Sequence, residues 1–237
     1  ASTAIQNAVA YGTTNGRGGL GCPVFFASGN ENSGVSYPAL YPEAIAVGAS
    51  SPCDERKSPS SCDGETWWGS NFGSSLDFVA PGPLTTTVDI AGSGGYSSTD
   101  YTSSFNGTSS ATPHAAGAGA LLLAVAPGLT HDEVRTLMRQ TADDQVGPPS
   151  EDTAGYDIYM GYGRINCESM LLAVGSSVSA PTNLTCNASG ADAELSWTNG
   201  DSYSQIQVSR DGTVIATLSG STTSYTDTSA GVGNISY

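Results

Sequence analysis

A serine at position 109 lies between a Gly-Thr pair and a long apolar run, a setting that suits nucleophilic attack. Gly107 lets the backbone approach a ligand closely, and the alanines and leucines that follow recur at helical spacing from Ala111 to Val125. We therefore expect Ser109 at the N-terminus of a helix, where free backbone amides and the positive end of the helix dipole favour an oxyanion. The chemistry that this pattern predicts is attack of the hydroxyl on a carbonyl carbon.

A serine hydroxyl needs a histidine that takes up its proton, and usually a carboxylate that orients this histidine. The chain contains two histidines, His114 and His131. His114 lies five residues beyond Ser109 on the expected helix, roughly 140° around its axis, so its ring should point away from the hydroxyl. Thr130 and Glu133 have the spacing of a capping box, which puts His131 in the first turn of another helix. Both histidines are therefore predicted to be structural.

Three blocks of the sequence together resemble the subtilisin-like serine proteases. The first runs from Phe105 to Pro127, and the resemblance implies that Ser109 is the nucleophile. The second, Val24 to Asn30, is a short apolar run that ends in an amide, and Asn30 would be the side-chain donor of the oxyanion hole. In subtilisin, loss of that asparagine slows the reaction by about two to three powers of ten. The third block covers residues 37–48.

The resemblance also implies a substrate-binding pocket. Ala27, Ser28 and Gly29 would form one wall of the pocket for the side chain that precedes the scissile bond. Ser36 would lie at its base, and the small residues there would admit a large side chain. The bond between residues 37 and 38 precedes a proline and is expected to be cis, as in relatives.

A cation site is implied as well. Backbone carbonyls of Ala39, Tyr41 and Ala44, with the carboxylate of Asp77, would hold a structural ion such as Ca²⁺. Asp77 could equally be a solvated carboxylate at the end of a strand. No cofactor is required for the chemistry itself.

In this family the catalytic aspartate and histidine both precede the strand that ends in the oxyanion asparagine. Here that strand begins about twenty residues from Ala1. The resemblance therefore predicts that the chain lacks the N-terminal half of the catalytic domain. That half would be a necessary partner, and the fragment alone is expected to be inactive, because removing one triad member already costs several powers of ten in rate.

Composition excludes several classes of partner. The chain carries 7 basic and 22 acidic residues, a formal net charge of −15, and such a surface repels nucleic acids and anionic membranes. No stretch approaches a membrane span. The 30 glycines and 12 prolines, together with few charges, are typical of a loop-rich, folded, secreted protein.

The five cysteines lack Cys-x-x-Cys spacing, which favours disulfides over zinc. Cys53 and Cys62 bracket a short polar loop and are the first predicted pair. Cys167 and Cys186 would form a second pair across the domain junction. Cys22 then either pairs with a cysteine of the missing half or packs as a buried free thiol.

Short apolar runs alternate with helical patterns, which predicts a parallel sheet covered on both faces. The runs cover residues 24–27, 44–49 and 77–80. Ligands of such sheets bind beyond the carboxyl ends of the strands, where Asn30 lies. Together with the resemblance, this gives an α/β fold class for residues 1–175: a three-layer, parallel-sheet, subtilisin-like domain whose N-terminal part is missing.

Residues 176–181 are small and polar and are expected to be a linker. In residues 182–237, apolar and polar residues alternate, which predicts a truncated all-β sandwich of antiparallel strands. Asp211 and Gly212 have the signature of a hairpin turn. This hairpin and Trp197 resemble a fibronectin type III module, which typically needs about 100 residues, so the module is expected to be incomplete and to act as a spacer.

The function implied by the resemblance is that of a secreted serine endopeptidase, which cleaves polypeptide substrates through a Ser-His-Asp triad. Of its machinery only Ser109 and Asn30 would lie in this chain. The alternative is a non-catalytic pseudoprotease that acts as a binding or adhesion protein through its β-sandwich module.

Overall fold

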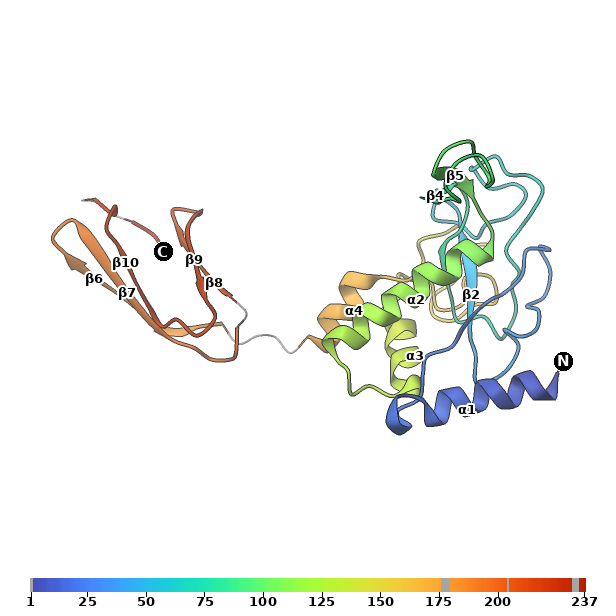
Figure 1. Ribbon diagram of the computed structural model, residues 1–237, viewed down its shortest axis with the longest axis horizontal. Helices are drawn as coiled ribbons and strands as arrows, with labels where there is room; N and C mark the ends of the chain where they lie inside the picture. The colour runs from blue at the N-terminus through green and yellow to red at the C-terminus, as the bar shows by residue number, and fades with distance from the viewer. Residues whose placement is uncertain (1, 176–179, 204, 232–234) are drawn as a thin grey trace. The chain divides into compact units, whose positions relative to one another are not determined.

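A computed structural model of the protein describes residues 2–175, 180–203, 205–231 and 235–237 (Figure 1). The chain divides into two compact units, Ala1–Val174 and Gly175–Tyr237, and each has a hydrophobic core of its own. Residues 176–179 of the predicted linker lie outside the described residues.

The first unit is built on a parallel sheet of three short strands in the order β1-β2-β3. These strands are β1 (Phe25–Ala27), β2 (Ile45–Ser50) and β3 (Phe78–Pro81). Each begins one residue later than the apolar runs predict. All six residues of β2 are buried, as expected for a central strand that is covered on both faces.

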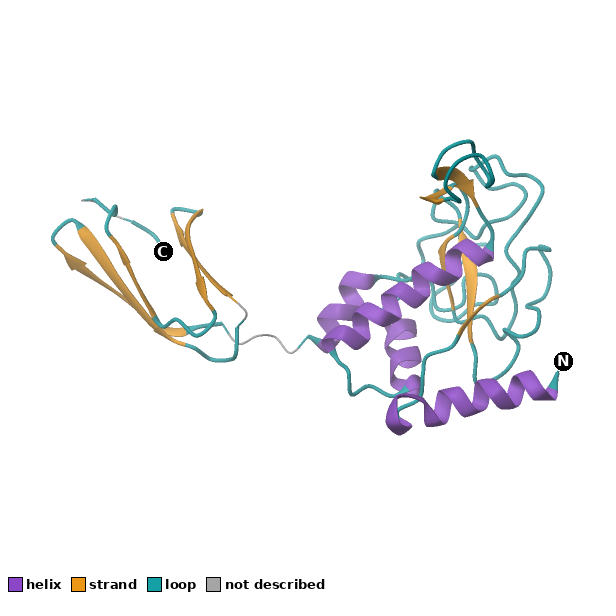
Figure 2. Ribbon diagram, in the orientation of Figure 1, coloured by secondary structure: helices purple, strands orange, loops and turns teal. Residues whose placement is uncertain are grey.

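Four helices belong to this unit: α1 (Thr3–Gly19), α2 (Thr108–Val125), α3 (His131–Gln140) and α4 (Cys167–Val174). Helix α2 packs against all three strands and against α3 and α4, as the grouped purple helices of Figure 2 show. On the other face, Ala46 packs with loop residues, and α1 contributes Val9 to a small cluster beside it. The sheet is therefore covered by helices on one face, and by loops and α1 on the other.

Helix α2 lies close to the sheet because its buried side chains are small. Ala111, Ala115 and Ala118 recur on one face and are at most 2% exposed, and Leu122 follows one turn later. At Gly119, even a Cβ atom would come within 2.9 Å of the Phe25 ring. The alanine and glycine content of this helix thus fixes its distance from β1.

A hairpin that the sequence did not predict precedes α2. Its strands are β4 (Thr85–Val88) and β5 (Tyr101–Phe105), and β5 runs directly into the turn before Ser109. The long connection between them is organised by two aspartates: Asp89 accepts hydrogen bonds from the amides of residues 90 and 97, and Asp100 accepts one from the amide of residue 92. Threonines and serines fill both strands, so no alternation of apolar residues marked them.

The regular elements in the described part of the second unit are all strands. A three-stranded sheet contains β6 (Thr182–Ser189), β7 (Asp192–Thr198) and β10 (Ser224–Asp227), and a two-stranded sheet contains β8 (Gln205–Arg210) and β9 (Thr213–Ser219). All pairings among these strands are antiparallel, as the alternation of apolar and polar residues predicts. The turn between β8 and β9 has positive φ at Asp211 (49°) and Gly212 (79°), as the predicted hairpin turn requires.

The core of the second unit contains Leu195, Trp197 and Val208. Beside it, Asp227 is 2% exposed and accepts hydrogen bonds from Arg210 and Tyr237. Burial acts to raise the pKa of this carboxyl, but the bonds from Tyr237 and Ser229 and the charge of Arg210 outweigh it and lower the pKa to about 2. The same burial and bond raise the pKa of Tyr237 to about 12.

One of the two predicted disulfides is formed. Cys53 and Cys62 are bonded, with their Cα atoms 6.3 Å apart. The second predicted pair is not present: Cys167 and Cys186 are both free and exposed, and each lies in a different unit. Cys22 is a free, half-buried thiol.

Among the described residues, no helix combines the length and apolar character that crossing a bilayer requires.

Candidate active site

Ser109 lies in the first turn of α2, as predicted, and is exposed. Its neighbours Thr108 and Ser110 are buried, so the turn presents this one side chain to solvent. Gly107 precedes the helix with a φ of 101°, a conformation that side-chain-bearing residues rarely adopt. Pro113 lies one turn further along and has no N–H, so the Ser109 carbonyl receives no helical hydrogen bond from it.

Asn30, which follows β1, lies beside the turn that precedes Ser109. Its Oδ1 accepts hydrogen bonds from both the amide and the hydroxyl of Thr108, each 2.8 Å long. A Cβ atom added to Gly107 would lie 3.2 Å from the Asn30 Nδ2, so this nitrogen lies directly beside the turn. Among the described residues, Nδ2 has no hydrogen-bond acceptor. The amide is therefore fixed through its oxygen, while its N–H groups remain available for another molecule.

The backbone amide of Ser109 is available in the same way. The first helical acceptor, the carbonyl of Gly107, receives the amides of Ser110 and Ala111. The amide of Ser109 comes before both of these and has no acceptor within the described part of the chain. Two unused donors, one from a side chain and one from the backbone, thus flank an exposed hydroxyl at a positive helix end.

Asn30 lies where it does because the chain turns sharply after β1. Gly29 has a φ of 116°, and a Cβ there would clash with the side chain of Asn71 at 2.2 Å. Asn71 is 1% exposed and accepts hydrogen bonds through its Oδ1 from the amides of Glu31 and Ser33. This buried amide therefore shapes the loop that presents Asn30.

Neither histidine lies at the site, as predicted. The His114 Nδ1 lies 2.9 Å from the carbonyl of Ser110 within α2. His131 begins α3, where Thr130 and Glu133 form the predicted capping box. His131 is 5% exposed, and burial, with a smaller contribution from Arg135, lowers the pKa of its ring despite the opposing charges of Asp132 and Asp77.

The residues expected to form a substrate pocket do lie together at the end of β1. The Ser36 hydroxyl and amide both donate to the carbonyl of Ser28, at 3.1 and 2.9 Å. Ser28 itself is fully buried and donates to the carbonyl of Asn71. Its amide donates to the carbonyl of Val47, so Ser28 presents no exposed group to a ligand, whereas Ala27 and Gly29 are half-buried and Ser36 is exposed. The peptide bond between residues 37 and 38 is cis, as predicted.

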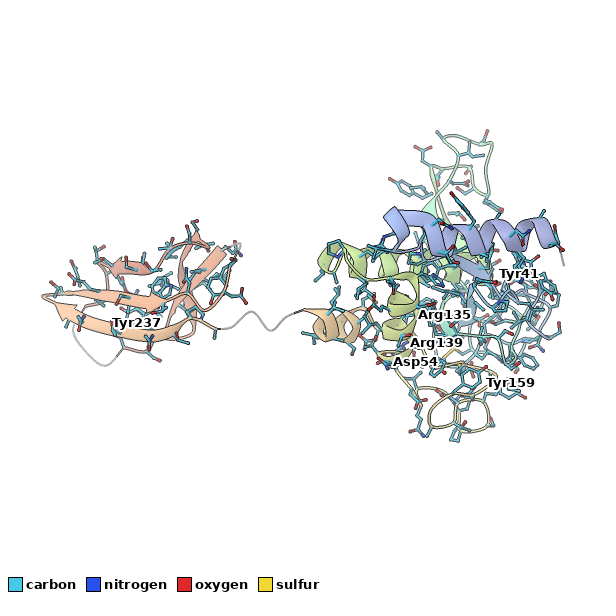
Figure 3. All side chains as sticks on the ribbon, turned by 90° about the horizontal axis from the view of Figure 1, so that it is seen from below. Tyr41, Asp54, Arg135, Arg139, Tyr159 and Tyr237 are labelled. Carbon is cyan, nitrogen blue, oxygen red and sulfur yellow. A yellow bond between two sulfur atoms is a disulfide. The ribbon has the colours of Figure 1, made fainter. Side chains whose placement is uncertain are left out.

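The residues expected to bind a cation do not fit one at Asp77. Its fully buried carboxylate accepts hydrogen bonds from the guanidinium groups of Arg135 and Arg139 and from the amide of Ala46. Figure 3 shows these two arginines side by side, and they line a cavity of about 360 Å³. Two positive groups at one carboxylate repel a cation.

The other expected cation ligands are partly used within the chain. The carbonyl of Tyr41 accepts the amide of Ala44 in a turn, and Ala39 is 1% exposed. No group of three or more His, Cys, Asp or Glu side chains that could hold a metal occurs among the described residues. The alternative reading of Asp77 as a solvated carboxylate is wrong as well, because the group is buried and paired.

Thr108 is the residue of this site that sequence reasoning missed. Besides its two bonds to Asn30, its hydroxyl accepts the amide of Gly29 at 3.3 Å. One threonine therefore links the loop after β1 to the start of α2. The position of Thr108 directly before Ser109 could have drawn attention to it. The sequence around Thr108, however, does not indicate a hydrogen-bond partner 78 residues away.

Comparison with known proteins is consistent with this arrangement. Residues 1–163 match the model of the Subtilase family. The chain is 37% identical over 172 residues to a "Calcium-dependent protease" of Nostoc sp., covering 67% of this chain and 26% of that protein. It is 36% identical over 172 residues to "Subtilisin" of Bacillus pumilus, covering 70% of this chain and 51% of that protein. The chain thus spans between a quarter and a half of the length of these relatives.

Solved structures show the same fold. One of the proteases from Pseudoalteromonas arctica matches with a TM-score of 0.56 and 23% identity, over 73% of this chain and 48% of that one. A lanthipeptide protease matches with a TM-score of 0.54 and 22% identity, over 72% of this chain and 54% of that one. Since the family model covers more than half of the sequence, the chain belongs to the subtilase family of serine proteases.

Proposed function

We propose that this chain supplies the nucleophile and the oxyanion hole of a secreted serine endopeptidase that hydrolyses polypeptides. The observation that carries the proposal is the convergence of the Ser109 hydroxyl with two unused donors, the Ser109 amide and the Asn30 Nδ2, on one exposed turn. Donors placed in advance where negative charge develops are the largest single source of rate enhancement in many acyl-transfer enzymes.

In the proposed reaction, the Ser109 Oγ attacks the carbonyl carbon of the scissile peptide bond and forms a tetrahedral intermediate. The carbonyl oxygen becomes an oxyanion that accepts hydrogen bonds from the Ser109 amide and the Asn30 Nδ2. The intermediate then expels the amine, and water releases the acyl group from Ser109. Ala27, Gly29 and Ser36 are proposed to receive the side chain that precedes the scissile bond, with the buried Ser28 behind them.

The proton of Ser109 requires a base, and the described geometry leaves neither histidine of this chain in that role. His114 is bound within its own helix, and His131 is buried at the start of α3. We therefore propose that the histidine and aspartate of the triad come from residues outside this sequence. The segment by itself would be inactive, since loss of the triad base removes most of the rate enhancement.

Secretion is proposed because of the disulfide between Cys53 and Cys62, a bond that persists in oxidising compartments. The net charge of −15 supports polypeptides rather than nucleic acids or anionic membranes as partners. Some relatives are named calcium-dependent, and a Ca²⁺ requirement is proposed here for the whole protein without assigning the ion to Asp77.

The second unit is proposed to be a fibronectin type III-like spacer. Its two antiparallel sheets, its buried Trp197 and its hairpin at residues 211–212 support this assignment.

Labelling by a fluorophosphonate probe tests the proposed activity. The full-length protein should be labelled at Ser109, and Ser109→Ala should abolish both labelling and hydrolysis of a peptide substrate. Ser110→Ala is a matched control, because that buried hydroxyl is bonded to Thr85 and faces away from solvent. If the full-length protein resists the probe and cleaves no peptide, the endopeptidase proposal is wrong and the non-catalytic alternative gains support.

A further inference from the structure

Between β2 and β3 the chain makes a polar loop that is closed by the disulfide between Cys53 and Cys62. The loop is organised around Lys57, whose side chain is fully buried. The Lys57 Nζ lies 3.0 Å from the Asp63 carboxylate and donates to the carbonyl of Glu65 at 2.6 Å. It also lies 5.0 Å from the centre of the Trp68 ring. Because Lys57 is buried and hydrogen-bonded to the backbone of Glu65, it restricts the motion of the loop at Glu65.

Glu65 connects this loop to the turn that carries Ser109. One carboxylate oxygen, Oε2, accepts the indole N–H of Trp68 at 2.6 Å. The other, Oε1, accepts the side-chain amide of Asn106 at 3.1 Å. Asn106 lies between β5 and Gly107, three residues before Ser109. The carboxylate therefore holds the chain just before it enters α2, through charge-assisted hydrogen bonds, which are stronger than neutral ones.

The Trp68 ring packs in the same place. At Gly82, a Cβ atom would lie 3.2 Å from the carbonyl oxygen of Gly107 and 3.4 Å from the Cη2 atom of Trp68. Gly82 is thus wedged between the indole and the turn, and Trp68 is only 3% exposed. The indole of Trp68 thus fixes the Glu65 carboxylate through a hydrogen bond and packs beside Gly82, the residue that faces the turn.

The turn before Ser109 is consequently held from two sides. On one side Asn30 accepts the amide and hydroxyl of Thr108, and on the other Glu65 accepts the side chain of Asn106. Asn30 is itself part of the proposed oxyanion hole, whereas Glu65 is bonded away from the nucleophile and touches no reacting atom. Gly107, between the two anchors, has a φ of 101° and no side chain to restrict it, so its conformation depends on its neighbours.

We infer that Glu65 is a positioning residue for the nucleophile: through Asn106 it fixes the orientation of the Gly107–Ser109 turn, and hence the alignment of the Ser109 hydroxyl and amide. This inference rests on the proposed function. A misplacement of about 1 Å at a catalytic group can cost up to a hundredfold in rate, so a small rotation of this turn is sufficient to impair acyl transfer.

The test compares Glu65→Ala with Glu55→Gln in the full-length protein. Glu55 lies in the same loop and accepts the amide of Cys62, but it does not contact Asn106. Glu65→Ala should lower kcat, and the rate constant for fluorophosphonate labelling of Ser109, by about ten- to a hundredfold, with KM changed less than about twofold. Glu65→Gln keeps one oxygen for the two donors, Trp68 and Asn106, and should recover only part of the lost rate. Glu55→Gln should match the wild type.

Asn106→Ala removes the other partner without touching the bond between Glu65 and Trp68, and it keeps the inference testable if Glu65→Ala does not fold. Besides the bond that they share, Asn106 also donates to the carbonyl of Ser104, and Glu65 also accepts the indole of Trp68. The shared bond is lost only once in the double variant, so the combined loss of rate should be smaller than the product of the two single losses. Labelling of Asn106→Ala at the wild-type rate, or multiplicative losses in the double variant, would overturn the positioning role while leaving the endopeptidase intact. A wild-type protein that is not labelled at all would instead remove the proposed function, and the inference with it.

Discussion

The site around Ser109 and the ion-paired centre around Asp77 lie in the same unit, yet their polar groups differ in exposure and in how completely they are hydrogen-bonded. Ser109 and Asn30 are exposed, and the donors beside them lack acceptors among the described residues. The Asp77 carboxylate is fully buried, and five hydrogen bonds or ion contacts from two arginines and one amide satisfy it. A polar group left incomplete at the surface is available for chemistry, while a polar group completed in the interior serves the fold.

The strongest test of this contrast is to break the completed, buried centre. Asp77→Ala leaves the charges of Arg135 and Arg139 without their carboxylate. Removing one member of a buried ion pair typically costs about 3–5 kcal/mol. The free energy of unfolding from urea titration should fall by this amount. A loss below about 1 kcal/mol would show that the arginines find solvent and that the centre is not structural.

Substitution of the exposed Asn30, whose Nδ2 has no acceptor among the described residues, should lower activity rather than stability. Asn30→Ala removes one oxyanion donor and should lower kcat by about two to three powers of ten, the loss known for removal of the oxyanion asparagine in subtilisin. Its effect on the free energy of unfolding should stay near 1 kcal/mol, the usual worth of hydrogen bonds such as those to Thr108. Asn15→Ala, on the exposed side of α1, is the matched control and should leave kcat unchanged. An equal loss of kcat in both variants would refute the role of Asn30.

His131 adds a third case, a buried ring whose two nitrogens have no hydrogen-bond partner among the described residues, although the exposed Asp132 carboxylate lies 3.9 Å from its Nε2. Because burial lowers the pKa of His131 in the folded protein below its unfolded value, its neutral form supports the fold above about pH 6.5, and that support is lost as the pH falls below this value. One proton contributes a slope of at most about 1.4 kcal/mol per pH unit. His131→Gln should flatten the dependence of unfolding free energy on pH between 7 and 5, measured by denaturant titration. If the slope of unfolding free energy against pH is unchanged in His131→Gln, the pH dependence comes from other groups.

The smallest effect is expected at the capping box of α3, where the polar groups lie near the surface and are already hydrogen-bonded to each other. Thr130 caps α3 by accepting the amide of Glu133, and the Glu133 carboxylate accepts the amide of Thr130 in return. Thr130→Ala should lower the free energy of unfolding by about 1 kcal/mol and leave kcat within twofold. Thr130→Ser, which keeps the capping oxygen, should restore most of the stability. A large loss of activity in Thr130→Ala would link α3 to the site in a way the contacts do not explain.

Sequence patterns predicted the parts of this fold that depend on local chemistry. The apolar runs gave all three strands of the parallel sheet, the capping box gave the start of α3, and Asp211 with Gly212 gave the turn of the second unit. The hairpin of β4 and β5 was missed because its serines and threonines carry no apolar alternation.

At the site, motif context singled out Ser109 and Asn30, because each residue has a local signature, and Asn30 does lie beside the turn that carries Ser109. The partners of Asp77 could not be predicted in this way. Arg135 and Arg139 lie on another element, about sixty positions along the chain, and only tertiary packing brings them to β3. The same holds for the bond between Glu65 and Asn106, which joins residues 41 positions apart.

Thr108 makes three hydrogen bonds with one backbone amide and one hydroxyl, and this restricts what can replace it. Valine has almost the same shape, but its side chain can neither donate to Asn30 nor accept from Gly29, so only the backbone amide of residue 108 would still bond Asn30. Serine keeps the oxygen and sacrifices only a methyl group. Among side chains of comparable volume, position 108 therefore tolerates a single alternative.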